Sequence, residues 1–69
     1  MRNRQQAIQI LEENAAQCNM DVKEYAEHSA QEDPTFYTWL FPEAEHIDNY
    51  GMGMTKDETK EANDFIASL

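Results

Sequence analysis

The sequence predicts an all-α protein: a small single-domain bundle of four short helices, with a fifth short helix as the one variation. Three observations support this fold class. Apolar residues recur at spacings of three and four in several segments, helix start signals precede those segments, and no two segments offer themselves as paired strands. The 69 residues leave room for one domain over residues 1–69. Its core must be small, because a chain of this size buries only about 60% of its unfolded surface.

The first predicted helix spans residues 3–18. Its apolar stripe, at spacings of four, four and three, consists of Ala7, Leu11, Ala15 and Cys18. Such a stripe is typical of a helix that packs one face on a core. We therefore expect the thiol of Cys18 to be buried. Because Cys18 is the only cysteine, a disulfide within the chain and a thiolate zinc cluster are excluded.

A second helix is predicted to follow Asp21 and to end near Gln31. Asp21 is a good N-cap residue, and Glu24 three residues later makes a variant of the capping box. The expected buried face of this helix consists of Val22, Tyr25, Ala26, Ser29 and Ala30.

A third helix is predicted to start at Asp33-Pro34, because an acidic cap followed by proline suits a helix N-terminus. Residues 35–41 are rich in strand formers and by themselves could be a strand. We prefer a helix closed by Pro42, because a lone strand would leave its backbone groups without partners. One or two helical turns are then expected in residues 43–50.

The last helix has the clearest start signal. Thr55 and Glu58, three residues apart, form a regular capping box. The apolar stripe behind it consists of Ala62, Phe65, Ile66 and Leu69. The preceding residues 51–53 are expected to be the most flexible loop, because two of the three are glycines.

Charge is the strongest functional signal. The chain has 14 acidic against 5 basic residues, and residues 24–55 contain no lysine or arginine. Such a surface repels phosphate and attracts basic proteins. Carboxylates along helices can imitate the phosphate rows of a duplex, and in size and charge the chain resembles small viral inhibitors of host or defence proteins. The alternative is that the acids form a solvated face that only maintains solubility.

The aromatic cluster in residues 36–41 is too wide for one helical face. We expect Phe36, Trp39 and Leu40 to enter the core. Tyr37 and Phe41 are then the expected exposed pair, suited to an interface because aromatic side chains dominate binding energetics. The residues predicted to bind a partner are Glu27, Glu32, Asp33, Tyr37, Phe41, Glu43, Glu45 and Asp48. Met52 and Met54 either adapt to a partner or plug the core beneath their loop.

A separate pattern covers residues 25–40. Its packing positions are Tyr25-Ala26, Ala30, Thr35-Phe36 and Trp39-Leu40. In these positions the segment resembles the helix-turn-helix family, which implies a transcriptional regulator that binds DNA weakly or as a dimer. The positions that would face the major groove are Glu32, Asp33, Pro34, Tyr37, Thr38 and Phe41. None is basic, so direct DNA reading is disfavoured. A degenerate module used for protein contact and an unrelated helical hairpin are the other interpretations.

No constellation of residues indicates catalysis. Glu24, His28 and Glu32 are spaced by four and could share an ion, but a solvated surface row is the simpler interpretation. No apolar run approaches the roughly 20 residues of a membrane span. We expect a soluble cytoplasmic protein that is monomeric or homodimeric. We also expect that it is not an enzyme and that it binds no metal, cofactor, membrane or nucleic acid directly. Its predicted role is to dock on a basic partner protein and to inhibit or regulate it.

Overall fold

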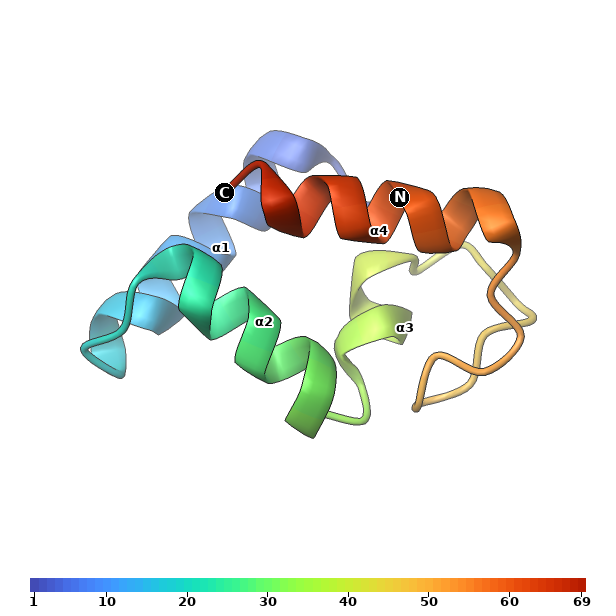
Figure 1. Cartoon of the computed structure of the whole chain (residues 1–69), viewed down its shortest axis with the longest axis horizontal. Helices are drawn as coiled ribbons and strands as arrows, with labels where there is room; N and C mark the ends of the chain where they lie inside the picture. The colour runs from blue at the N-terminus through green and yellow to red at the C-terminus, as the bar shows by residue number, and fades with distance from the viewer.

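The computed structural model describes residues 1–69 and confirms the all-helical class. Its four helices are α1 (Arg4–Gln17), α2 (Val22–Glu32), α3 (Phe36–Leu40) and α4 (Lys56–Ala67). In Figure 1, α4 runs above α2, α1 lies behind them, and α3 sits between α2 and the long loop that leads to α4. α2 packs against each of the other three helices. It is therefore the central element of the bundle.

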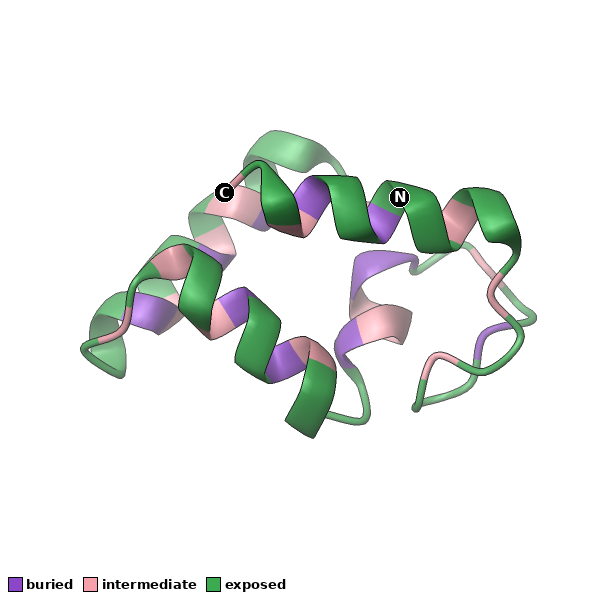
Figure 2. Ribbon diagram, in the orientation of Figure 1, coloured by how far each residue is buried: buried purple, intermediate pink, exposed green.

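The core combines small residues on the long helices with bulky residues from α3, the loop and α4. The core residues are Ala7, Leu11, Ala26, Phe36, Leu40, Phe41, Ile47, Ala62 and Phe65. In Figure 2 the buried bands of α2, α3 and α4 face one another. Alanines at the contact faces let the helices approach closely, and the aromatic rings fill the space between them. The five-residue α3 thus supplies two of the nine core residues, Phe36 and Leu40.

The end of α1 corrects the prediction for Cys18, which is exposed. Cys18 is the C-cap of α1, and Asn19 behind it has a left-handed backbone with φ 55°. The amides of Asn19 and Met20 donate to the carbonyls of Ala16 and Ala15, at 3.2 and 2.9 Å. This pattern is a Schellman motif, which reverses the chain. The last buried residue of the apolar stripe is therefore Ala15, and the thiol of Cys18 lies at the surface.

The predicted cap residues of α2 and α4 are present, but Glu24 does not accept the Asp21 amide, so the capping box predicted for α2 is reduced to the Asp21 cap. The Asp21 side chain accepts a hydrogen bond from the Lys23 amide at 3.2 Å. The Thr55 hydroxyl accepts from the Glu58 amide, and the Glu58 carboxylate accepts from the Thr55 amide. The capping box predicted from four residues of sequence is confirmed in both directions.

The predicted start of α3 is wrong by two residues. Asp33 does not cap the first turn of a helix; its Oδ1 accepts hydrogen bonds from the amide of Thr35 at 2.9 Å and from its hydroxyl at 2.7 Å. This Asx turn holds Pro34 and Thr35 outside the helix, which begins at Phe36. The helical turns expected in residues 43–50 are absent, and that segment consists of short non-helical turns and irregular backbone.

Residues 1–3 close the open end of α3. The Arg2 amide donates to the Leu40 carbonyl at 2.7 Å, and Arg2 Nε donates to the Trp39 carbonyl at 2.9 Å. The Arg2 guanidinium also lies 4.9 Å from the centroid of the Trp39 ring. Carbonyls at a helix C-terminus have no partner within the helix and carry partial negative charge. Arg2 supplies both the hydrogen bonds and the positive charge.

Candidate functional site

The outer face of α2 is acidic. Ala26 and Ser29 point into the protein, so the residues on the opposite side of the helical wheel face solvent. Glu24, Glu27 and Glu32 are all exposed. None of these three carboxylates forms an ion pair with a basic side chain. This face therefore presents negative charge that the protein itself does not neutralise.

The basic side chains do little to offset this charge, because two of them lie against aromatic rings of the protein. Arg2 lies on Trp39. Arg4 lies 5.6 Å from the centroid of the Phe65 ring and donates to the Ser68 hydroxyl. Every acidic residue except Glu58 is exposed, and the only carboxylates paired with basic side chains are Glu58 with His46 and Asp64 with Lys60. The exterior is consequently dominated by unpaired carboxylates.

The loop between α3 and α4 is held by an Asx turn. Asp48 Oδ1 accepts hydrogen bonds from the amides of Tyr50 at 2.8 Å and Met52 at 2.9 Å, while the Asp48 amide donates to the Met52 carbonyl at 3.1 Å. Gly51, with φ 78°, packs against the Tyr37 ring so closely that a Cβ would lie 2.6 Å from its Cδ2. Residues 48–52, which we call the loop tip, are thus ordered by contacts within the protein.

The loop tip presents the most exposed large apolar side chains of the molecule. Tyr50 is 76% exposed and Met52 is 68% exposed. Tyrosine is enriched at binding hot spots, and methionine adapts to irregular surfaces. Because contacts of Asp48 and Gly51 already hold the backbone, little backbone conformational entropy is left to lose when the loop tip is bound.

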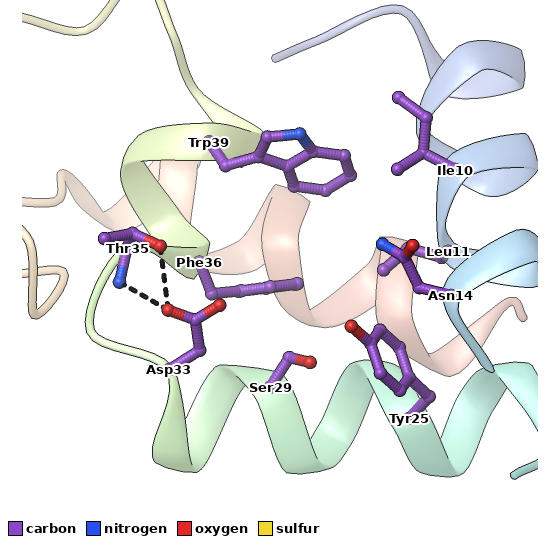
Figure 3. Close-up of a pocket in the computed structure, with 9 residues that line it drawn as sticks. All are labelled: Ile10, Leu11, Asn14, Tyr25, Ser29, Asp33, Thr35, Phe36 and Trp39. Atoms are coloured by element: carbon purple, nitrogen blue, oxygen red, sulfur yellow. Dashed lines mark hydrogen bonds between the residues drawn. The ribbon is translucent and has the colours of Figure 1, made fainter. Parts of the chain in front are cut away.

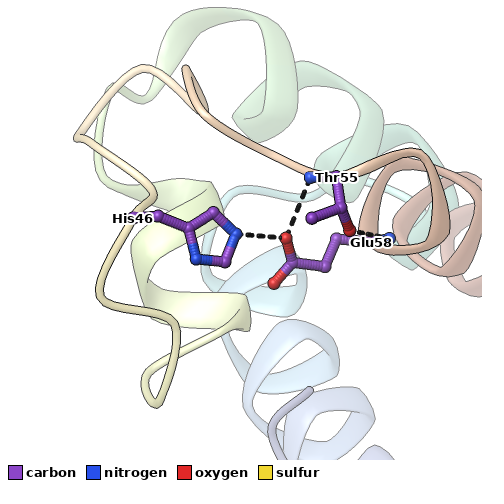
Figure 4. Close-up of polar contacts among 3 residues, drawn as sticks. All are labelled: His46, Thr55 and Glu58. Atoms are coloured by element: carbon purple, nitrogen blue, oxygen red, sulfur yellow. Dashed lines mark hydrogen bonds and ion pairs between the residues drawn. The ribbon is translucent and has the colours of Figure 1, made fainter.

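A polar cluster of His46, Thr55 and Glu58 ties the loop to α4 (Figure 4). His46 Nε2 lies 2.6 Å from Glu58 Oε1, and the same oxygen accepts the Thr55 amide at 3.0 Å. The Thr55 backbone hydrogen bond, followed by the His46 hydrogen bond, lowers the pKa of Glu58 below its ordinary value of 4.5. Glu58 therefore stays ionised, and its carboxylate serves as a helix cap and a loop anchor.

The predicted acidic site residues fall into two groups in space. Glu27, Glu32 and Asp33 lie on α2 or directly after it, and Glu43, Glu45 and Asp48 lie in the loop. All six residues are exposed. Asp33 and Asp48 each commit one oxygen to an Asx turn, so their first role is structural. In Figure 1 the C-terminal end of α2 and the loop tip both reach toward the lower side of the molecule.

The prediction that Phe41 is exposed is wrong. Phe41 is 3% exposed and belongs to the core. α3 ends at Leu40, and Phe41 has a non-helical backbone with φ −119° and ψ 68°. Helical periodicity therefore does not apply to Phe41, and its ring turns inward. Tyr37 is only partly exposed, because it packs edge-on against Phe36 at 5.4 Å between centroids and lies beneath Gly51.

The residues predicted from the sequence to bind a partner include neither Tyr50 nor Met52. The signal that identifies them is local: an aspartate two residues before Tyr50 can cap its amide, and Gly51 directly behind it tolerates a positive φ. A bulky residue between two such turn residues sits at the apex of a tight turn. It has few neighbours to cover it, as the exposure of Tyr50 shows.

A metal site and a membrane span each require a particular arrangement of residues. No three histidine, cysteine, aspartate or glutamate side chains lie together so that they could hold a metal ion. None of the helices combines the length and the apolar composition that a membrane crossing requires. The chain matches no protein-family model, no curated protein and no solved structure.

Proposed function

We propose that this chain is a non-enzymatic binding module that docks on a basic partner protein and inhibits or regulates it. The observation that carries the proposal is the pairing of two features: exposed, unpaired carboxylates on α2 and the loop, and an ordered loop tip that exposes Tyr50 and Met52. A partner that normally binds nucleic acid fits best, because it offers a basic surface on which carboxylates can take the place of phosphates.

The two features have different energetic roles. An exposed ion pair contributes about 0.2–1 kcal/mol and is screened by salt, so the carboxylates mainly raise the association rate and select basic partners. A buried aromatic anchor contributes about 2 kcal/mol or more. Tyr50 is therefore expected to supply the largest single share of affinity, with Met52 beside it.

The test begins with capture of the partner from the native host, followed by measurement of the dissociation constant in a salt series. Glu43→Lys with Glu45→Lys is the first variant, because both residues are exposed and neither accepts a capping hydrogen bond. We expect it to weaken binding by about tenfold or more at physiological salt, where charges act over about 8 Å.

The matched control is Glu12→Lys with Glu13→Lys on the exposed face of α1, which changes the net charge by the same amount. Equal weakening by both pairs would mean that only net charge matters, and it would refute a localised docking surface. An affinity that is independent of salt and unaffected by either pair would refute the imitation of phosphate. Tyr50→Ala should weaken binding by a factor that hardly changes with salt, because its contact is apolar.

The second candidate, a helix-turn-helix regulator, makes a different prediction for labelled duplex DNA. α3 has five residues, and it carries no basic side chain. A surface that repels phosphate should show no binding near physiological salt. Salt-sensitive binding of duplex DNA by the isolated protein would overturn the present proposal in favour of the regulator.

A further inference from the structure

A small cavity lies where α1, α2 and α3 meet (Figure 3). Its volume is about 150 Å³. Tyr25, Phe36 and Trp39 contribute aromatic walls, and Leu11 and Ile10 line the side formed by α1. Pockets for drug-sized molecules span about 300–1,000 Å³. This cavity is therefore of a size for one side chain rather than for a metabolite.

The cavity contains polar groups without partners in the protein. Ser29 is the only buried polar residue, at 7% exposure, yet its hydroxyl takes part in no hydrogen bond within the chain. The side-chain amide of Asn14 and the Tyr25 hydroxyl also border the cavity and make no hydrogen bond to other protein groups. No side-chain polar atom is sealed away from solvent without a partner, so the Ser29 hydroxyl reaches open space. Figure 3 shows this hydroxyl directed into the cavity.

The single charged group of the lining is Asp33. Its Oδ1 is occupied by the amide and the hydroxyl of Thr35, whereas its second oxygen accepts no hydrogen bond and points toward Phe36 and the cavity in Figure 3. No lysine, arginine or histidine lines the space. Aromatic faces attract cations, and a free carboxylate oxygen accepts a charge-assisted hydrogen bond. The chemistry of the lining thus selects a cation.

Arginine suits this lining better than lysine does. A guanidinium is planar, stacks on aromatic faces and is more weakly hydrated than an ammonium. The chain itself shows that the Trp39 ring accepts a guanidinium, because that of Arg2 lies 4.9 Å from its centroid. Arg2 does not line the cavity, so its guanidinium does not occupy it.

We propose that this cavity receives one arginine side chain of the basic partner protein. The aliphatic stem lies along Leu11, and Asp33 accepts the hydrogen bonds of the guanidinium. The guanidinium packs on the aromatic wall rather than between the Phe36 and Trp39 rings, whose centroids are 6.0 Å apart. This inference rests on the proposed function, and it adds which side chain of the partner is recognised and where. It also gives the partner a fixed register on the chain, which dispersed surface carboxylates alone would not provide.

The first experiment uses N-acetyl-arginine amide as the probe. Trp39 is the only tryptophan, so its fluorescence reports on the cavity directly, and backbone amide NMR shifts map the contact. N-acetyl-citrulline amide is the matched neutral probe, because it has nearly the same shape without the charge. We expect saturable arginine binding at least about fivefold tighter than citrulline binding, since hydrogen bonds to charged groups are the stronger class. N-acetyl-lysine amide should fall between the two.

The second experiment uses a matched pair of variants. Asp33→Asn removes the charge but keeps an oxygen for the Thr35 amide, so the Asx turn survives. Asp21→Asn makes the same change in a residue that caps the amide two positions later, as Asp33 does, but lies outside the cavity. Asp33→Asn should weaken binding of the arginine probe by about tenfold, and Asp21→Asn should leave it unchanged. Thermal melts of the two variants establish that both remain folded.

Equal binding of the arginine and citrulline probes, or shifts spread over the whole acidic surface, would overturn the assignment of the cavity. So would equal losses in the two variants. These results are separable from the proposed function. If the cavity fails these tests while Glu43→Lys with Glu45→Lys still weakens the captured partner, the docking proposal stands without the arginine site. If the arginine probe binds the cavity and the charge reversals have no effect, the docking proposal fails alone.

Discussion

Replacing Thr55 by alanine tests the best-defined local contact of the fold. The substitution deletes the hydroxyl that accepts the Glu58 amide at 3.1 Å, whereas the return bond from the Thr55 amide to Glu58 Oε1 at 3.0 Å can persist. Half of the capping box is lost, so the expected cost is that of a single N-cap, about 1 kcal/mol. In a domain of this size, 1 kcal/mol lowers the melting temperature by roughly 4–8 °C.

Thr59→Ala is the control, because it makes the same chemical change one turn further along the same helix. Thr59 is exposed, lies within α4, and its hydroxyl makes no hydrogen bond in the structure. Alanine is a better helix former than threonine by about 0.5 kcal/mol, so this variant should melt slightly above the wild type. Thr55→Ala should lower the free energy of unfolding and Thr59→Ala should raise it, so the two variants should differ in stability by about 1.5 kcal/mol.

Thermal melting followed by circular dichroism measures this difference in stability, and urea titration provides a second measurement. For a slope near 1 kcal/mol/M, the lower end of the usual range, the loss at Thr55 moves the urea midpoint by about 1 M. Coincident melts of the two variants, or a Thr55→Ala protein as stable as the wild type, would refute the energetic role assigned to the cap.

Three further outcomes are expected. Phe41→Ala should lower the free energy of unfolding by about 3–5 kcal/mol, which is most of the stability of a small domain. The helical circular dichroism signal in the far ultraviolet should therefore largely disappear at 25 °C. A well-folded variant that only lost partner binding would contradict the core position of Phe41. Gly53→Ala should destabilise the protein by about 1–3 kcal/mol, because φ is 90° and a Cβ would lie 2.1 Å from the His46 carbonyl oxygen; an unchanged melting temperature would count against this geometry. Glu58 has a folded pKa below its ordinary value of 4.5, so its contribution is present above that value and is lost as the pH falls through the lower folded pKa. Urea midpoints measured against pH should therefore fall more steeply below 4.5 for wild type than for Glu58→Gln, and parallel curves would exclude this linkage.

The helices that the sequence predicts well are those specified by neighbouring residues. Thr55 and Glu58 specify the start of α4 within four residues, and Asp21 does the same for α2. Such signals act through hydrogen bonds between residues close in the chain, so periodicity and capping rules are sufficient to find them. The all-helical class follows from several such segments together.

The errors arise where contacts between distant residues decide the outcome. Helical periodicity predicts a buried Cys18 and an exposed Phe41, but both residues lie just past a helix end, where the chain changes direction. The Asx turn at Asp33 resembles a helix cap in sequence, and the difference appears only when the side chain is placed. The cavity could not be predicted at all, because its walls come from three helices whose packing no local pattern specifies.

The contact of Arg2 with the end of α3 couples two segments 37 residues apart in the chain. A helix of five residues has almost no stability of its own in water, so α3 persists only while the core and residues 1–3 hold it. These segments should therefore open and close as one cooperative unit, below the global unfolding transition. The Arg2 amide, which donates to Leu40, and the Phe41 amide, which donates to Tyr37, would then exchange their hydrogens with the same opening free energy. A ligand that holds Trp39 in place would slow both exchanges together, and so would be felt at the first residues of the chain without touching them.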